Sequence, residues 1–482
     1  MSLFGECLRE LVLDNQVNVY GFAKTAKIER TLLHKIMSGA RLPSPDYLSH
    51  LVDALPISPQ ERQRLLKSYD ISKVGEFKYN QRIQVKSIIE SIAAIEDGLE
   101  IPPGLPATGF SFDSASSTTV TGHFAVNNLI KALIEEAVSN SRQEVDFVIP
   151  ESYLFFYNEL LSYYLRNPKM RIRHVIAFSK KLDMTNNTNK NLHMLSQVMS
   201  FSFAPASGYF PCYYYQSSID ADFAHAMPYF LLTSSGRLLL IGKDLNRAAL
   251  ISDPDIVNMY RESFSEMLVQ STPLIKRFDS APELLAHLVS TDYDCENEPY
   301  HWIEPEPCIG PFFSDEEIDG LIMPEIPFRN RIVELLFQHY DFLRSNQICN
   351  INVCTAAGLK SYIDSGHLYY SPKEYMIPAP RDMMKGALSR LSDKVADNKV
   401  KLLFTNPSKF TVPGKLLFSI NKRTGINFIL CSGESSALRA ICLSEDSINE
   451  AFADFIESIE SSELVFSASE SLALLNNAIG GL

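Results

Sequence analysis

Basic side chains gather in one short stretch near the start of the chain. Residues 24 to 41 hold five Lys or Arg residues and a single acidic residue, Glu29, which gives a local charge of +4. Cationic side chains contact nucleic-acid phosphates, and together with hydroxyl and imidazole groups they reach base edges in the major groove. This chemistry predicts a surface for double-stranded DNA made by the following side chains: Lys27, Arg30, Thr31, Leu32, His34, Lys35 and Arg41.

The apolar pattern around these residues predicts two short helices that present them. The apolar positions form two facing stripes, Phe22, Ala23 and Ala26 on the first helix and Leu33 and Ile36 on the second. Residues 26 to 28 fall between the stripes as a turn. Gly39 follows the second helix where a left-handed residue is wanted, and Arg41 lies in the next loop, close to where a phosphate would be. Closing the apolar stripes on each other leaves the polar side of the second helix outward.

Three further amphipathic segments complete a small helical domain. Phe4, Cys7, Leu8 and Leu11 have i, i+3, i+4, i+7 spacing, which predicts a helix before the pair. Ser44 followed by proline is an N-cap signal for a fourth helix, and Ser58 with Glu61 forms a capping box for a fifth. Five short helices in about 70 residues suffice for one small core.

Residues 3–70 resemble the Xre family, the Cro and lambda-repressor type of helix-turn-helix domain. The resemblance rests on the helix order, the turn, the terminal Gly39 and the segment Arg41-Leu42-Pro43-Ser44. It implies an all-α DNA-binding domain over residues 1–70. By the resemblance, four side chains fall on recognition-helix positions that contact bases or backbone: Arg30, Thr31, His34 and Lys35.

This chain departs from the family pattern at three positions. Val19 replaces a polar phosphate-binding residue, Lys27 replaces the glycine of the turn, and Glu29 replaces a small hydroxyl cap. A five-helix domain of this kind can also serve as a protein-docking module. We expect DNA binding because the positive charge lies on the element that would meet the duplex.

Overall composition restricts nucleic-acid contact to one end of the chain. The 482 residues are 46% hydrophobic and carry a net charge of −13, and the length suggests about three domains. Residues 1–70 hold 9 basic and 8 acidic residues, a net of +1, whereas the remainder holds 35 and 49, a net of −14. The acidic bulk is therefore expected to face away from DNA.

Cysteine spacing and hydropathy place the protein in a reducing compartment. The eight cysteines show no CxxC pairs, so neither a zinc site nor a disulfide framework is expected, and no cofactor is predicted. The most hydrophobic run, residues 229–241, is interrupted by polar residues and Gly236. We therefore expect a cytoplasmic protein that makes no membrane contact.

The remainder of the chain reads as an α/β region. Residues 71–122 form a connector, with a helix over 84–95 and a Pro/Ser/Thr-rich linker from 101. Helical patterns at 126–138 and 153–165 then alternate with strand patterns at 145–149 and 172–178, which favours a largely parallel sheet.

An internal repeat divides this α/β region. The first copy has two strand patterns (213–216 and 229–232), a hairpin signal, a helix and the ending FDSAPELLAHLV. The second copy repeats this order with strand patterns at 416–420 and 426–430, a hairpin signal, a helix and the ending FSASESLALLNN. The fold class is therefore predicted to be multidomain: a five-helix domain followed by two related α/β subdomains. The predicted boundaries are 123–294 for the first repeat, 295–325 for an acidic, proline-rich connector and 326–482 for the second repeat.

The function of the duplicated region is open from sequence alone. A cleft between the repeats is a natural ligand site. Connector residues Glu298, His301, Trp302, Glu304 and Glu306 are interpreted as exposed loop chemistry, with a metal or cation site as the alternative.

Two classes of function follow from these patterns. Phosphate-loop, HExxH and GxGxxG motifs are absent, as is a paired HxK arrangement, and Gly433 to Ala437 is interpreted as a hairpin turn rather than a nucleophile elbow. We favour a transcriptional regulator that is not an enzyme: a homodimer whose duplicated region senses a small molecule, peptide or partner. The alternative is an enzyme with an attached docking domain and its active site between the repeats.

Overall fold

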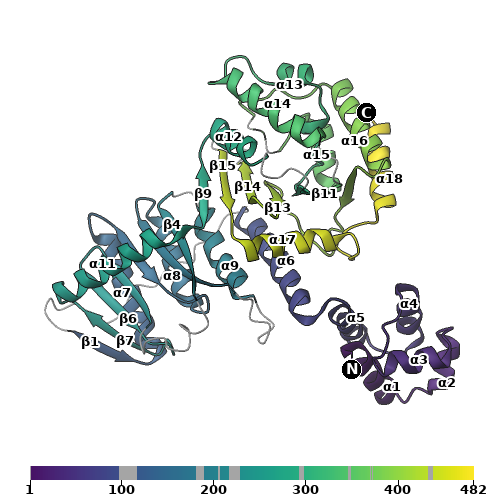
Figure 1. Cartoon of the computed structure of the whole chain (residues 1–482), viewed down its shortest axis with the longest axis horizontal. Helices are drawn as coiled ribbons and strands as arrows, with labels where there is room; N and C mark the ends of the chain where they lie inside the picture. Colours follow the sequence, from purple (N-terminus) through teal and green to yellow (C-terminus); the bar gives the residue numbers. More distant parts are fainter. Residues whose placement is uncertain are drawn as a thin grey trace. The chain divides into compact units, whose positions relative to one another are not determined.

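A computed structural model of the chain divides into two compact units (Figure 1). One contains residues 1–84, and the other contains most of the chain from Val85 onward. The structure describes residues 2–96, 117–180, 189–204, 207–216, 228–292, 298–345, 349–369, 371, 373–431 and 438–482. The molecule is multidomain, with many helices and two mixed β-sheets. Among the helices within these ranges, none has the length and apolar character needed to cross a membrane.

Five helices occur before residue 75, at the positions that the sequence patterns predict. They are α1 (Leu3–Asp14), α2 (Val19–Thr25), α3 (Arg30–Met37), α4 (Pro45–Ala54) and α5 (Pro59–Val74). Ser44 caps α4 by accepting a hydrogen bond from the backbone N–H of Tyr47, and Ser58 and Glu61 form the expected capping box at α5. Local capping therefore defines where these helices begin.

A glycine in α1 allows two of these helices to pack closely. A Cβ atom built on Gly5 would lie 2.7 Å from the carbonyl oxygen of Ile36 and 2.8 Å from the backbone nitrogen of Gly39. The absence of a side chain at this position lets α1 meet the end of α3. Phe4, Leu8, Leu33 and Ile36 are buried in the same core, so the position of α3 is set by burial of its apolar side.

Helix α6 (Glu76–Glu96) follows Gly75, which has a positive φ of 88°. Its later residues Val85, Ile88, Ile89 and Ile92 belong to the core of the α/β unit. The helix that the sequence predicts over 84–95 is thus the second half of a longer one.

The first sheet of the α/β unit has eight strands in the order β1-β7-β6-β5-β2-β3-β4-β8. The strands are β1 (Thr118–Thr121), β2 (Glu144–Val148), β3 (Arg171–Ser179), β4 (Tyr209–Gln216), β5 (Tyr229–Thr233), β6 (Arg237–Ile241), β7 (Arg247–Ile251) and β8 (Thr272–Pro273). The helices of this half are α7 (His123–Ser139), α8 (Leu154–Arg166), α9 (Lys190–Ser202) and α11 (Pro254–Gln270). Strands β2, β3 and β4 run parallel, and the other pairs are antiparallel.

The second sheet has seven strands in the order β12-β11-β10-β13-β14-β15-β9. They are β9 (Ile275–Phe278), β10 (His301–Ile303), β11 (Asn350–Cys354), β12 (Val400–Phe404), β13 (Leu416–Asn421), β14 (Gly425–Cys431) and β15 (Leu438–Leu443). The helices of this half are α12 (Ala281–Asp292), the 3-10 helix η2 (Gly310–Phe312), α13 (Asp315–Leu321), α14 (Arg329–Ser345), α15 (Ala356–Ser365), α16 (Arg381–Ala396), α17 (Asp446–Ile459) and α18 (Ala468–Gly480).

Seven strands of the first sheet have the same order and directions as the seven strands of the second, and β8 has no counterpart. The series β4-β3-β2-β5-β6-β7-β1 matches β12-β11-β10-β13-β14-β15-β9 strand for strand, with three parallel strands followed by four antiparallel ones. The register places Phe147 of β2 opposite Leu231 of β5, and Trp302 of β10 opposite Ser419 of β13. These residues occupy corresponding positions in the two halves.

The strand pairing corrects the predicted repeat boundaries. The first sheet begins at β1, inside the segment predicted as linker, because residues 118–121 pair with β7. The second sheet begins at β9, because Ile275–Phe278 pairs with β15 rather than with the first half. The segment 295–325, predicted as a connector, contributes β10 between β11 and β13. The predicted hairpin turn at 433–437 lies outside the described residues, although the strands that flank it, β14 and β15, pair antiparallel.

The two halves are joined by a common core and by side-chain hydrogen bonds. A continuous apolar cluster includes residues of α7, α8, α9, β10, β13 and α17. Asn191 of α9 donates to Ser447 of α17 at 2.9 Å, and the Tyr215 hydroxyl donates to Glu445 at 2.7 Å. On another face of the first sheet, α11 packs through Val257 and Phe264 (Figure 1).

Candidate nucleic-acid interface and a buried polar cluster

A tight turn joins α2 to α3. The Asn18 side chain caps α2 by accepting hydrogen bonds from the backbone N–H groups of Tyr20 and Gly21. After Thr25 the backbone N–H of Ile28 donates to the carbonyl oxygen of Ala23 at 2.9 Å, which closes the turn. Lys27 lies between them with a positive φ of 53°. This left-handed conformation explains why a glycine would suit the position.

Replacing Lys27 by glycine is expected to stabilise the α2–α3 pair. A non-glycine residue in the left-handed region is strained by about 1–2 kcal/mol, and glycine removes this strain. Part of the stabilisation is offset because glycine has more conformational entropy in the unfolded chain. We expect a net gain of about 1 kcal/mol, measured as slower native-state hydrogen exchange of amides in α2 and α3. Lys27→Ala is the matched variant, because it removes the charge and keeps the strain. A Lys27→Gly protein with no greater protection than Lys27→Ala would contradict this account of the turn.

The polar side of α3 is exposed and its apolar side is buried. Leu33 and Ile36 are fully buried in the core of the helical unit, whereas Arg30, Thr31, His34 and Lys35 are all exposed. The last four have i, i+1, i+4, i+5 spacing, which places them on one side of the helix. The structure therefore brings these predicted contact residues together.

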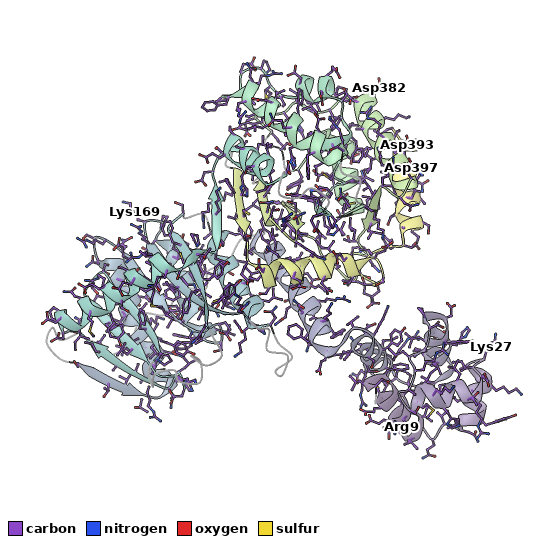
Figure 2. The ribbon with its side chains drawn as sticks, in the orientation of Figure 1. Arg9, Lys27, Lys169, Asp382, Asp393 and Asp397 are labelled. Carbon is purple, nitrogen blue, oxygen red and sulfur yellow. The ribbon has the colours of Figure 1, made fainter. Side chains whose placement is uncertain are left out.

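The other three predicted residues have different environments. Lys27 and Arg41 are exposed and flank the two ends of α3, and Figure 2 shows Lys27 at the periphery of the helical unit. Leu32 is only half-exposed and packs against the apolar core. Leu32 is thus mainly a packing residue, and its part in a contact surface is limited to its exposed edge.

Both ends of α3 are shaped by local hydrogen bonds. Glu29 precedes the helix without capping it through its side chain, and its carboxylate accepts a hydrogen bond from the Thr31 hydroxyl. At the other end Gly39 has a φ of 75°, and its backbone N–H donates to the carbonyl oxygen of Ile36 at 2.9 Å. The predicted glycine stop is confirmed. The Glu29–Thr31 contact is a feature that residue spacing did not indicate.

Two further side chains are exposed on α2, the helix before α3, and were not predicted as site residues. Tyr20 in the first turn of α2 is 69% exposed, and Lys24 in its last turn is exposed. A signal was present in the sequence, because both fall outside the apolar stripe of Phe22 and Ala23. An exposed tyrosine carries a hydroxyl that can contact a phosphate.

Four of the five residues predicted as exposed connector chemistry are in fact buried, and the fifth, Glu298, is half-buried. His301, Trp302, Glu304 and Glu306 are 3%, 7%, 0% and 2% exposed. Their burial follows from the position of β10 in the middle of the second sheet, with neighbouring strands on both sides. Among the described residues, no group of three or more His, Cys, Asp or Glu side chains could hold a metal ion.

The two glutamates lie in a polar cluster just after β10. The side-chain amide of Asn352 donates a hydrogen bond from Nδ2 to a carboxylate oxygen of Glu304 at 2.7 Å. Its Oδ1 accepts a hydrogen bond from the backbone N–H of Cys308 at 3.1 Å. Glu306 accepts from the backbone N–H of Tyr369. Burial, together with the charge of Glu306, raises the pKa of Glu304 well above its usual range, and burial raises the pKa of Glu306 to about 7. Burial therefore shifts the protonation equilibrium of both carboxyl groups towards the neutral form.

Comparisons with known proteins do not assign the chain. No family model matches it, and no curated protein matches it. TrmBL2, an archaeal chromatin protein, is 10% identical with a TM-score of 0.22, over 55% of this chain and 98% of that one. Phosphatidylserine synthase from Haemophilus influenzae Rd KW20 is 9% identical with a TM-score of 0.25, over 82% and 96%. Polyphosphate kinase from Porphyromonas gingivalis is 10% identical with a TM-score of 0.23, over 79% and 59%. Likenesses at this level carry no argument about fold or function.

Proposed function

We propose that this chain is a sequence-specific DNA-binding transcriptional regulator, with an Xre-type helix-turn-helix domain at its N-terminus. The observation that carries the proposal is the two-sided character of α3: Leu33 and Ile36 anchor it, and Arg30, His34 and Lys35 project outward. A helix anchored in this way presents a constant set of cations and donors to the major groove. The exposed Lys27 and Arg41 at its ends suit contacts with flanking phosphates.

The negative charge of the larger unit supports a model in which only the helical unit contacts DNA. Residues after 70, which include all of the larger unit, carry a net charge of −14. The exposed acidic residues Asp382 and Asp393 lie on α16, and Asp397 caps its C-terminal end (Figure 2). An acidic body repels the duplex, so DNA contact is confined to the basic helix. The α/β unit, with its two sheets of equal topology, serves in this proposal as two related subdomains that sense an effector or partner.

Dimerisation is part of the proposal. One helix with a few base contacts buries too little surface for strong specific binding, and pairing of half-sites is the usual remedy. Two copies of this chain would then read a two-fold symmetric site in the cytoplasm.

Sequencing of the duplexes retained by the full-length protein tests this function. We expect a random duplex pool to be enriched for a symmetric site, with retention falling steeply between 50 mM and 200 mM salt as phosphate contacts require. A pool processed with the protein omitted is the control. Failure to retain any duplex at low salt would contradict the proposal, and enrichment of one unpaired half-site would contradict the dimer.

A further inference from the structure

A cavity of about 150 Å³ lies inside the second half of the α/β unit, rather than between the halves. It is bounded by side chains from β10, β13 and β14 on one side and from α12, α13 and α14 on the other. Most of these side chains are aliphatic or aromatic, including Leu288, Trp302, Phe313, Ile332, Leu343 and Leu417. A cavity lined in this way repels water and favours an apolar guest.

The corresponding place in the first half is filled by aromatic rings. Phe147, which corresponds to Trp302, contacts Phe156 at 4.8 Å between ring centroids and stacks on His174 at 4.2 Å. In the second half Trp302 stacks instead on Tyr300, with centroids 5.5 Å apart, and both rings line the cavity. The two halves thus share a topology, and the second leaves open a volume that the first occupies.

Small residues help to keep this volume open. A Cβ atom on Gly310 would lie 2.5 Å from the Tyr340 hydroxyl oxygen. Only a residue without a side chain therefore allows the Tyr340 ring to occupy its position in the cavity wall. Ser419 lines the cavity where the first half carries the larger, fully buried Leu231. The cavity therefore depends on residue choices that differ between the two halves.

Among the polar side chains that line the cavity, His339 is held in a fixed orientation by a buried carboxylate. His339 lines the cavity, and its Nδ1 is 2.9 Å from a carboxylate oxygen of Asp292. Asp292 is 4% exposed, and its other carboxylate oxygen has no hydrogen-bond partner among the described residues. Because Asp292 engages Nδ1, the His339 nitrogen that remains for a guest is Nε2.

We propose that this cavity binds a monocyclic aromatic molecule with one hydroxyl group, that is, a phenol. A volume of about 150 Å³ is the size that holds a single benzene ring. Trp302 and Tyr300 supply the aromatic wall, and His339 accepts the hydrogen bond of the hydroxyl. The role of this guest as an effector rests on the proposed regulatory function, whereas its binding does not.

Fluorescence of Trp302 provides a direct test with the full-length protein. Trp302 is the single tryptophan of the chain, so a guest against its ring changes the only tryptophan signal. We expect phenol to produce a saturable change, with toluene binding about tenfold more weakly because it lacks the hydroxyl. His339→Leu should reduce this preference for phenol to near unity. A wild-type protein with no saturable change, or with equal affinity for phenol and toluene, would overturn the assignment.

Filling the cavity provides a second test. Ser419→Leu introduces the residue that the first half carries at the corresponding position, so the fold has a precedent for it. We expect this variant to lose phenol binding at least tenfold, and the matched surface variant Ser265→Leu on α11 to retain it. Equal binding by both variants would place the guest elsewhere and overturn the proposal.

The effector role is tested separately through retention of duplex DNA. We expect phenol to change the retention of the enriched duplex by the wild-type protein and to leave retention by Ser419→Leu unchanged. A protein that binds phenol without any change in retention would contradict the effector role. A protein that binds phenol but retains no duplex would contradict the proposed function and leave the assignment of the cavity intact.

Discussion

Replacing Arg30 and Lys35 together by alanine is expected to weaken binding of the full chain to its preferred duplex by about 30-fold to 10⁴-fold. Each such contact with a base or phosphate is worth about 1–3 kcal/mol, and every 1.4 kcal/mol is tenfold in affinity. Both side chains are exposed, so their removal leaves the apolar core of the helical unit intact. Titration of a labelled duplex with the full chain measures the effect.

Salt dependence and a matched variant separate this effect from a general loss of charge. We expect the slope of log affinity against log salt to fall by about 2 if both side chains contact phosphates. The control is Arg381→Ala with Lys385→Ala, which removes two exposed cations from α16 in the α/β unit. An equal loss of affinity in the control, or no loss in the α3 variant, would contradict the assigned interface.

Replacing Glu306 by glutamine is expected to stabilise the α/β unit above pH 7 by about 3 kcal/mol. Burial raises the pKa of Glu306 from 4.5 to about 7. The folded protein therefore retains a proton that the unfolded chain releases, and the free energy of unfolding falls as the pH rises from 4.5 to 7. At about 1.36 kcal/mol per pKa unit, this shift corresponds to about 3 kcal/mol. Glutamine is neutral throughout this range and can still accept the hydrogen bond from Tyr369.

Denaturant unfolding followed through Trp302 measures this effect in the unit that contains Glu306. We expect the difference between Glu306→Gln and wild type to be small at pH 4.5 and to grow towards pH 7. Burial also lowers the pKa of His301 to about 4. Its contribution to the free energy of unfolding is therefore lost as the pH falls from 6.5 to 4, by the same amount in wild type and in Glu306→Gln. The exposed substitution Glu374→Gln is the control. A difference independent of pH would show that Glu306 is ionised in the folded state.

The helical unit could be predicted from sequence almost residue by residue. Its determinants are local: the caps Ser44 and Ser58, the stop at Gly39 and the apolar stripes that position α3. The contact between Glu29 and Thr31 was not predicted, because it depends on side-chain direction rather than on residue spacing.

The α/β unit was predicted less completely, because its pairing is nonlocal. The three-residue strand β10 is followed by alternating glutamate and proline, a pattern typical of a loop, and only its pairing with β11 and β13 makes it a central strand. The burial of Glu304 and Glu306 follows from that pairing. The cavity beside Trp302 also depends on contacts between segments far apart in the sequence, so no short pattern could indicate it.

A single residue, Leu274, separates β8 of the first sheet from β9 of the second, and it is buried. A protein fragment that starts near residue 295 would therefore lack β9 and uncover the backbone of β15. Uncovered strand edges pair with other chains and promote aggregation. Dissection of this protein should cut on the N-terminal side of β9, so that the second sheet keeps its own border strand.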